Sequence, residues 1–323
     1  MFVLTVFGRR NTMYTILGAT GNIGSKLAEI LVKQGEEVRL VSRTADRLLP
    51  SLMQKARKDE TFVGNAQSYV GDILDTEFLS KALEDSRSVF TMIPPNPKVD
   101  NFLTYANRMS ESIARAIEIA KVKYVVNISS VGADLSDGGT GPITGLHNLE
   151  ERLNRIKGLN VMHIRAGYFM ENLFSFVDLI RSRGITGSAI RGDLKIPMIA
   201  TRDIADFVAK HLVKCDFSGS SVAYLLGQRD LSLIEATAII GNKIGNPDLK
   251  YILFPYDDAE KSLIAAGLSP NMSQSYIEMS RAFNEGRINR SFKRTRTNTT
   301  ATSFETFCEE VFMPVCLNKK KAA

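Results

Sequence analysis

Two residue types with rich chemistry are scarce in this chain of 323 residues. It has three cysteines and three histidines: Cys215, Cys308, Cys316, His147, His163 and His211. An odd number of isolated cysteines, none in a CxxC pair, is typical of free thiols in a reducing compartment, so we expect a cytoplasmic protein. The histidines are too scattered for a metal site, and the HExxH and EF-hand patterns are absent. The sequence therefore predicts no metal.

Long apolar runs are also missing. No stretch approaches the roughly 20 apolar residues that a membrane-spanning helix needs. In the opening segment, "MFVLTVFGRRNT", the apolar residues come before the charges, which is the reverse of a signal peptide. Met13 then begins a phrase typical of a nucleotide-binding strand. We expect residues 1–12 to be a disordered extension.

Positive charge is concentrated rather than widespread. The net charge is +6, and seven of the basic residues form a loop segment and a tail: Arg290, Lys293, Arg294, Arg296, Lys319, Lys320 and Lys321. The rest of the chain is close to neutral. Such runs are usually solvated, and we predict no direct nucleic-acid partner.

What the sequence does have is a regular alternation of strand and helix patterns. Strands are predicted at 14–20, 37–43, 66–73, 88–95 and 123–130, and helices at 22–34, 74–85 and 101–122. Asp75 or Thr76 is the expected N-cap of the second helix. This order predicts an α/β fold with a Rossmann-type, doubly wound parallel sheet.

The order loosens in the second half. Helices are predicted at 148–158, 168–184, 201–213 (capped by Thr201) and 232–245, and strands at 159–167, 195–200 and 221–227. From Tyr251 onward we expect mostly helix and loop. We predict a first domain at 13–172 with a further strand near 221–227. A smaller, interleaved C-terminal α/β lobe takes 173–220 and 228–316, and 317–323 is a basic tail.

The segment "TILGATGNIG" places three glycines directly after the first strand. Gly18 allows a tight turn, Gly21 lets the backbone approach a pyrophosphate, and Gly24 lets the following helix pack closely. The helix that begins near Asn22 directs its N–H groups at that pyrophosphate. We predict that the domain binds NAD(P), with this turn supplying the following contacts: Gly18, Thr20, Gly21, Asn22, Ile23 and Gly24.

The second strand indicates which dinucleotide is preferred. It ends in Ser42 and Arg43, where an NAD site usually has an acidic residue. A guanidinium pairs with a 2′-phosphate and a carboxylate repels it, so we expect NADP(H), with NAD(H) possible. Asp72 follows the third strand, where it can accept from the adenine amine, and Ile73 is next to it.

Several ordered segments carry a resemblance to a known family. "GATGNIG", "SRTADRL", "GDILD", "ISSVGAD", "GTGPITGLHNLEERL" and "RAGYFMENL" resemble the NmrA-like branch of the atypical short-chain dehydrogenase/reductases, and the likeness extends from Met13 to Phe312. The resemblance implies a Rossmann domain with a small C-terminal lobe. Family members include NADPH-dependent quinone and azo reductases, isoflavone-type reductases and non-catalytic sensors of the NADP redox state.

One departure from the larger superfamily concerns the Tyr-x-x-x-Lys pair. The resemblance places Ile143 at the tyrosine position and His147 at the lysine position. His147 is thus a candidate to bind the nicotinamide ribose or to donate a proton, and capping a helix is its structural alternative. A quinone substrate is compatible with the absence of a tyrosine phenol. The oxyanion that develops when hydride reaches the quinone ring can be protonated by water or by His147.

Other strand ends complete the expected site. Ile93 and Pro94 would pack against the cofactor, and Ser129 would bond its nicotinamide side. Tyr168 and Phe169 could stack on a flat substrate and Asn172 could orient it, although core packing explains such aromatics equally well. Tyr168 is also a catalytic candidate. His163 is expected to be a satisfied core histidine, and Glu150 and Glu151 a solvated helix face.

Three functions remain open from the sequence. The first is an NADPH-dependent oxidoreductase that passes hydride to a quinone-like or azo-like small molecule. The second is a non-catalytic NADP(H) redox sensor that regulates a protein partner, which the missing Tyr-x-x-x-Lys pair favours. The third, an NADP-binding isomerase or epimerase, fits less well because such enzymes generally retain that pair.

Overall fold

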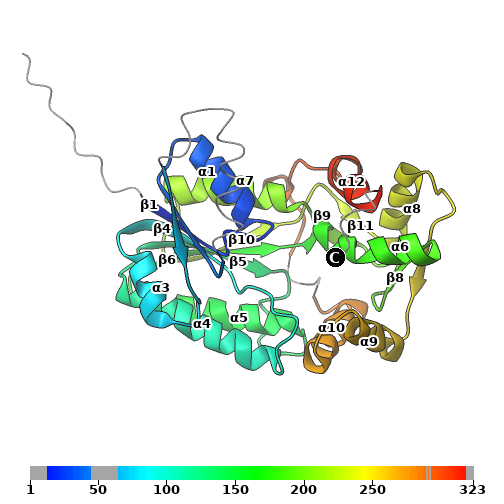
Figure 1. Ribbon diagram of the computed structural model, residues 1–323, viewed down its shortest axis with the longest axis horizontal. Coiled ribbons are helices and arrows are strands. Elements are labelled where there is room, and N and C mark those ends of the chain that lie inside the picture. Colours follow the sequence, from blue (N-terminus) through cyan, green and yellow to red (C-terminus); the bar gives the residue numbers. More distant parts are fainter. Residues whose placement is uncertain (1–12, 45–64, 289, 291, 318–323) are drawn as a thin grey trace, which may run out of the picture.

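A seven-stranded parallel sheet forms the centre of the molecule (Figure 1). The computed structural model describes residues 13–44, 65–288, 290 and 292–317. The spatial order of the strands is β10-β6-β5-β4-β1-β2-β3, and every neighbouring pair is parallel. The bounds are β1 Met13–Leu17, β2 Val38–Ser42, β3 Ala66–Val70, β4 Ser86–Thr91, β5 Tyr124–Ser130, β6 Asn160–Ala166 and β10 Ser220–Leu225.

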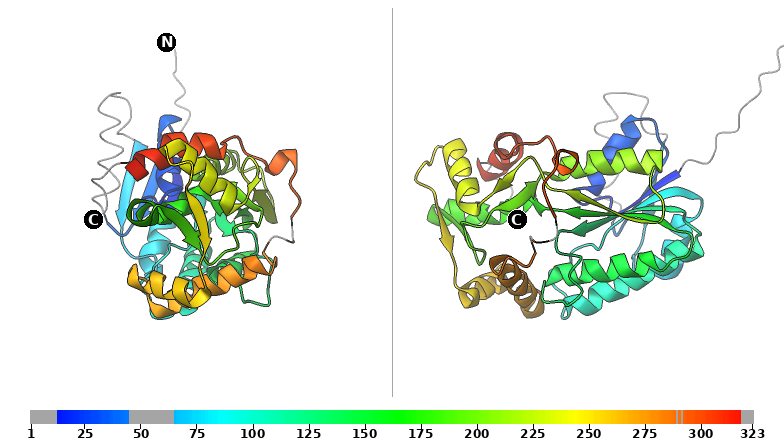
Figure 2. Two further views of the ribbon diagram at one scale, coloured as in Figure 1. Left: turned by 90° about the vertical axis from the view of Figure 1, so that its right-hand side faces the viewer. Right: turned by 180° about the vertical axis from the view of Figure 1, so that it is seen from behind.

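Helices cover both faces of this sheet, as Figures 1 and 2 show. One face carries α1 (Gly24–Lys33) and α7 (Thr201–Lys214), and the other carries α3 (Thr76–Leu83), α4 (Phe102–Ile119) and α5 (Pro142–Asn154). Successive strand residues point to opposite faces, so Val125 packs under α4 and α5 while Val126 packs under α1 and α7. The doubly wound α/β fold expected from the sequence is confirmed.

The helix ends follow from local sequence signals. The carboxylate of Asp75 accepts from the backbone N–H groups of Glu77 and Phe78, so Asp75 is the N-cap of α3. The Asn101 side chain caps α4 in the same way, and Pro142 occupies the first turn of α5. Such signals set where α3, α4 and α5 start.

The second half of the chain builds a lobe beyond the sheet's carboxyl edge. Two small sheets belong to it, made of β7 (Tyr168–Phe169), β9 (Ile196–Ile199) and β11 (Asp230–Leu231), and of β8 (Ile185–Ser188) and β12 (Lys250–Leu253). Its helices are a 3₁₀ helix at Met170–Phe176, α6 Val177–Arg183, α8 Leu233–Ile244, α9 Tyr256–Ala265, α10 Pro270–Asn284, a 3₁₀ turn at Arg296–Asn298, α11 Phe304–Phe307, a π-helical turn at Cys308–Phe312 and α12 Met313–Leu317.

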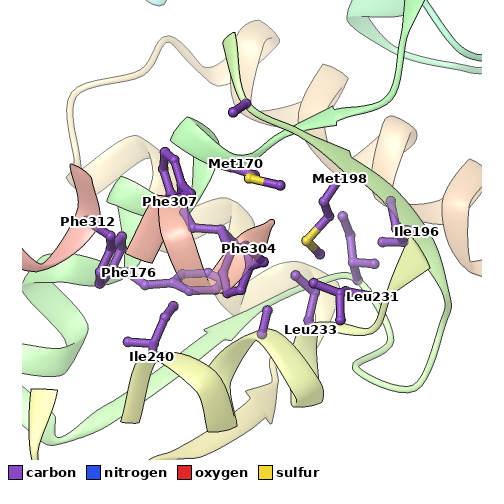
Figure 3. Close-up of a cluster of buried hydrophobic side chains, with 14 of the residues drawn as sticks. Met170, Phe176, Ile196, Met198, Leu231, Leu233, Ile240, Phe304, Phe307 and Phe312 are labelled. Carbon is purple, nitrogen blue, oxygen red and sulfur yellow. The ribbon is translucent and has the colours of Figure 1, made fainter. Parts of the chain in front are cut away.

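The lobe has its own hydrophobic core. Met170 and Phe176 from the 3₁₀ helix meet Met198 of β9 and Ile240 of α8 (Figure 3). The chain's final helical segment closes this core with three fully buried phenylalanines: Phe304, Phe307 and Phe312. Segments more than 130 residues apart meet in this cluster, so the C-terminal part of the chain completes the lobe's core.

Some sequence predictions were wrong in detail. Tyr168 and Phe169 form strand β7 rather than a helix, because they pair with Met198 and Ile199 of β9. Helix α5 begins at Pro142, six residues before the predicted start. Thr201 is the first residue of α7 and not its cap; Ala200 occupies that position, and Thr201 bonds Glu171 instead. Strands β8, β11 and β12 were not predicted, because each is short and depends on distant pairing.

Several predictions lie partly or wholly outside the described residues. The expected extension at 1–12 and residues 318–323 of the expected basic tail are among them. Of the basic loop segment, Arg294 is not simply solvated, because its guanidinium donates to the carbonyl oxygens of Leu226 and Gly227 and pairs with Asp230. Among the helices that the structure describes, none is long and apolar enough to cross a membrane.

Candidate functional site

All of the predicted contact segments lie at one edge of the central sheet. Because the seven strands are parallel, their carboxyl ends meet at the same edge, and the lobe sits beyond it (Figure 1). Gly18 follows β1, Arg43 follows β2, Asp72 follows β3, Met92 follows β4 and Ser130 ends β5. Ligands of doubly wound sheets bind at this edge, where the strand order reverses between β1 and β4.

The glycine turn has a geometry that only glycine allows. Gly18 has φ +68°, and its carbonyl oxygen accepts from the N–H of Gly21 at 2.9 Å. A Cβ atom on Gly24 would lie 2.3 Å from that same carbonyl oxygen, and one on Gly21 would lie 3.2 Å from it. Helix α1 can therefore start against the end of β1 only because Gly24 has no side chain.

The amino end of α1 is open to an anion. Ile23 is the N-cap residue and, within the described part of the chain, no side chain caps this helix. The first turn, Gly24–Leu27, contains no acidic residue, whereas Thr20 and Asn22 are exposed beside it. An uncapped amino end that follows a turn with three glycines fits the diphosphate of a dinucleotide.

The adenine end of the expected site is built by β2 and β3. Ser42 is buried and its hydroxyl donates to the Thr44 carbonyl, whereas Arg43 is exposed. Asp72 binds the backbone N–H of Leu74 through one carboxylate oxygen at 2.9 Å, which leaves its other oxygen to accept from an amine. Ile73 is buried at 5% exposure and forms an apolar wall.

Tyr105 of α4 also lies at this end, and the sequence analysis missed it. Its phenol donates to the Pro94 carbonyl at 3.2 Å. Burial raises the phenol's pKa, the Arg43 charge lowers it and the Asp72 charge raises it, so all three side chains share one neighbourhood. Tyr105 lies in the middle of a long amphipathic pattern, which is why the sequence gave no signal for it.

The next two strand ends supply apolar and polar contacts. After β4, Ile93 is buried and Pro94 is half-buried, while the Met92 sulfur would be 3.0 Å from a Cβ on Gly18. In β5 the hydroxyl of Ser129 is buried, and it has no hydrogen-bond partner among the described residues. A buried hydroxyl without a partner is costly and is often found where a ligand or water completes the bonding.

His147 has a defined orientation on α5. Its Nδ1 atom lies 2.8 Å from the Ala133 carbonyl oxygen. A carbonyl can only accept, so Nδ1 carries the hydrogen and, in the neutral ring, Nε2 is left as an acceptor. Ile143, one turn earlier on α5, is buried at 4% exposure. The helix thus offers an imidazole nitrogen but no phenol.

Helix α5 is held to the sheet by a buried ion pair. The Glu150 carboxylate accepts two hydrogen bonds from Arg165 of β6, at 2.6 and 3.1 Å, and is only 3% exposed. Burial alone lowers the pKa of Arg165, but the Glu150 hydrogen bonds and charge raise it above the ordinary value. The expectation that Glu150 belongs to a solvated face was wrong, because Arg165 draws it inward.

The aromatic segment after β6 divides between two cores. Tyr168 packs against the lobe, with the Phe283 ring edge-on at 6.5 Å, while Phe169 packs against the α1 and α7 layer. Burial raises the pKa of the Tyr168 phenol, and so do the nearby Tyr251 and Tyr276. Asn172 is exposed. The three phenols come from distant segments, so the sequence could not bring them together.

A separate surface groove of about 440 Å³ lies on the outer side of α4. It is lined by polar side chains of α4, among them the basic Arg108 and Arg115 and the acidic Glu111, together with Leu74, Thr76 and Arg152. None of the predicted contacts lines it. The groove therefore does not identify the site, which rests instead on the strand ends described above.

Comparison with known proteins places the chain in a family. Residues 10–308 match the NmrA-like family, and the chain belongs to it. This confirms the resemblance stated from the sequence segments.

Individual relatives have low sequence identity to this chain, but the matches cover most of the length of both proteins. An NAD(P)H azoreductase from Xenophilus azovorans is 23% identical over 269 residues, which is 83% of this chain and 86% of that protein. An NADPH-dependent quinone oxidoreductase from Escherichia coli, solved with NADPH, superposes with a TM-score of 0.74 at 20% identity, covering 93% of this chain and all of that one. NmrA, a negative transcriptional regulator solved with NADP, has a TM-score of 0.65 at 14% identity, covering 94% and 96%.

Proposed function

We propose that this protein is an NADPH-dependent oxidoreductase that passes hydride to a quinone-like or azo-like small molecule. The observation that carries the proposal is the glycine turn, whose three glycines leave room for a diphosphate at the uncapped end of α1. The azoreductase relative and the quinone oxidoreductase fold neighbour support the class of reaction.

Each strand end has a part in holding the cofactor. The turn from Gly18 to Gly24 holds the diphosphate, Arg43 pairs with the 2′-phosphate, and Asp72 accepts from the adenine amine. Ile93 and Pro94 line the cofactor, and Ser129 bonds its nicotinamide side. The Arg43 guanidinium favours NADPH, and NADH lacks the phosphate that it would bind.

The bound nicotinamide supplies the hydride. His147 binds a hydroxyl of the nicotinamide ribose through its unprotonated Nε2, because Nδ1 is committed to Ala133. Tyr168 stacks on a flat acceptor and Asn172 orients it, whereas Phe169 packs against the α1 and α7 layer. A phenol of ordinary pKa is already protonated at neutral pH, and burial raises the pKa of Tyr168 further, so its hydroxyl can donate a hydrogen bond to the oxyanion that develops on the reduced acceptor. The final proton comes from water. In the alternative arrangement a protonated His147 ring donates this proton from Nε2, and Nε2 then does not accept from the ribose.

A second candidate is a redox sensor that distinguishes NADP from NADPH and controls a protein partner. The buried Ile143 at the tyrosine position favours it, because no phenol of α5 can serve as proton donor. The fold similarity to NmrA, a negative transcriptional regulator, also favours it. The aromatic Tyr168, on the lobe side of this segment, favours the reductase.

The experiment that separates these candidates is oxidation of NADPH by the purified protein with a panel of quinones and azo dyes, with NADH run in parallel. Turnover above the uncatalysed rate, with NADPH preferred, is the expected result. Tight binding of NADP(H) without turnover of any acceptor would contradict the reductase and support the sensor. Failure to bind either dinucleotide would contradict both.

A further inference from the structure

A lysine in the first turn of α1 takes no part in the glycine pattern. The Lys26 ammonium donates to the Asn22 carbonyl oxygen at 2.9 Å and to the Thr201 hydroxyl at 3.1 Å. Asn22 lies inside the glycine turn, so the charge sits beside the backbone that we assign to the diphosphate. An ammonium has three N–H donors, and within the described part of the chain Lys26 uses two of them.

This position is unfavourable for a cation considered alone. Lys26 is half-buried, and burial lowers the pKa of its ammonium, with Arg202 acting in the same direction. The amino end of a helix also repels positive charge, because its unpaired N–H groups carry a partial positive charge. Something nearby must offset these costs, and Glu171 is one such group, since its charge raises the pKa of Lys26.

A series of hydrogen bonds through Thr201 and Glu171 holds the Lys26 ammonium in place. The Thr201 hydroxyl accepts from Lys26 and donates to Glu171, and the Thr201 backbone N–H donates to both Glu171 carboxylate oxygens at 3.1 Å. Glu171 is 9% exposed, so its carboxylate is fixed. Thr201 begins α7, which packs beside α1 on the same face of the sheet (Figure 1).

We propose that Lys26 is a diphosphate-binding residue of the cofactor site, held in position by Thr201 and Glu171. Its third N–H donates to a diphosphate oxygen, and the ligand's negative charge offsets the cost of the cation at this helix end. The inference rests on the proposed NADPH site and adds to it a side-chain contact that the glycine pattern does not contain. It also connects the cofactor to the segment that carries Tyr168 and Asn172.

The test compares two ligands by titration calorimetry: NADPH, and adenosine 2′-monophosphate, which has no diphosphate. Lys26→Met should weaken NADPH binding roughly ten- to a hundredfold, as expected for a charge-assisted hydrogen bond. Its affinity for adenosine 2′-monophosphate should be unchanged. Lys26→Arg should recover part of the NADPH affinity, and Lys33→Met, an exposed lysine on the same helix, should leave both affinities unchanged.

A double-mutant cycle tests the positioning role. Glu171→Gln should weaken NADPH binding by less than Lys26→Met does, and the double variant should match Lys26→Met alone. A folded Lys26→Met protein with normal NADPH affinity would overturn the inference and leave the proposed cofactor intact. Equal losses for both ligands would also overturn it, since they indicate a general disturbance of the site. If the wild-type protein binds neither ligand, the proposal that NADPH is the cofactor is itself ruled out.

Discussion

The imidazole Nδ1 of His147 lies 2.8 Å from the Ala133 carbonyl oxygen, which fixes the tautomer of the only histidine near the expected nicotinamide site. This bond joins α5 to the loop that follows β5. In the neutral ring this bond leaves Nε2 as an acceptor, at the position where the family resemblance predicts the lysine of a Tyr-x-x-x-Lys pair.

His147→Ala should therefore weaken NADPH binding by about 1 kcal/mol, roughly fivefold, since a neutral hydrogen bond to the ribose is lost. Steady-state kinetics and a fluorescence titration of NADPH measure this. If His147 also supplies the final proton, kcat falls as well. A variant with wild-type affinity and turnover would show that the histidine only joins α5 to the loop.

Arg43→Ala should change the choice of cofactor. Loss of the guanidinium should cost about 1.5–3 kcal/mol of NADPH affinity and little for NADH, because only NADPH carries the 2′-phosphate. Dissociation constants for both dinucleotides provide the measurement. Equal losses for the two would rule out the assignment of Arg43 to the phosphate.

Gly24→Ala should disrupt the glycine turn. The new methyl group would lie 2.3 Å from the Gly18 carbonyl oxygen, so α1 must shift, at a cost of roughly 1–3 kcal/mol in the free energy of unfolding. NADPH binding should be lost with it. Gly35→Ala is the control. Gly35 lies past the other end of α1, and a Cβ added there would have nothing within 4 Å. The variant should keep its affinity for the cofactor, although the φ of +79° strains an alanine.

Glu150→Gln should strongly destabilise the fold. It removes the nearer of two carboxylates from Arg165 and leaves that of Asp134 at 3.8 Å, so the cost should approach that of a broken buried pair, about 3–5 kcal/mol. Glu151→Gln is a matched control, because Glu151 is half exposed and lies 3.6 Å from Arg155, a pair worth about 0–1 kcal/mol. Chemical denaturation of both variants gives the comparison. Similar midpoints would mean that the buried pair contributes little.

The stability of the fold should fall on mild acidification because of His163. This ring is 1% exposed between Asn127 and Asn154, and burial lowers its pKa. The unfolded chain takes up a proton below about pH 6.5, whereas the folded chain resists it, so the free energy of unfolding falls from there to the folded pKa. Denaturation at pH 7 and pH 5.5 measures the decline. His163→Gln should lose less stability over this interval than the wild type; an equal loss would assign the effect to other groups.

The sequence by itself determined the doubly wound sheet, and it predicts a cofactor site at the carboxyl edge of that sheet. Alternating strand and helix patterns, and glycines at 18, 21 and 24, are local signals whose meaning depends on spacing along a few consecutive residues. The sequence also predicts a core role for His163 from its place in an apolar strand, and the structure buries it between Met162 and Ile164.

Only the tertiary structure decided which polar groups meet. Lys26 and Thr201 are 175 residues apart, and no local pattern marks either as a partner of Glu171. Glu150 has the sequence context of an exposed helix face, yet it is buried because Arg165 of the adjacent strand needs a counter-charge. Tyr168 is in a strand and not in the predicted helix, because its backbone pairs with Met198 of β9. In each case the deciding energy comes from desolvation and pairing across the fold, which spacing along the chain does not record.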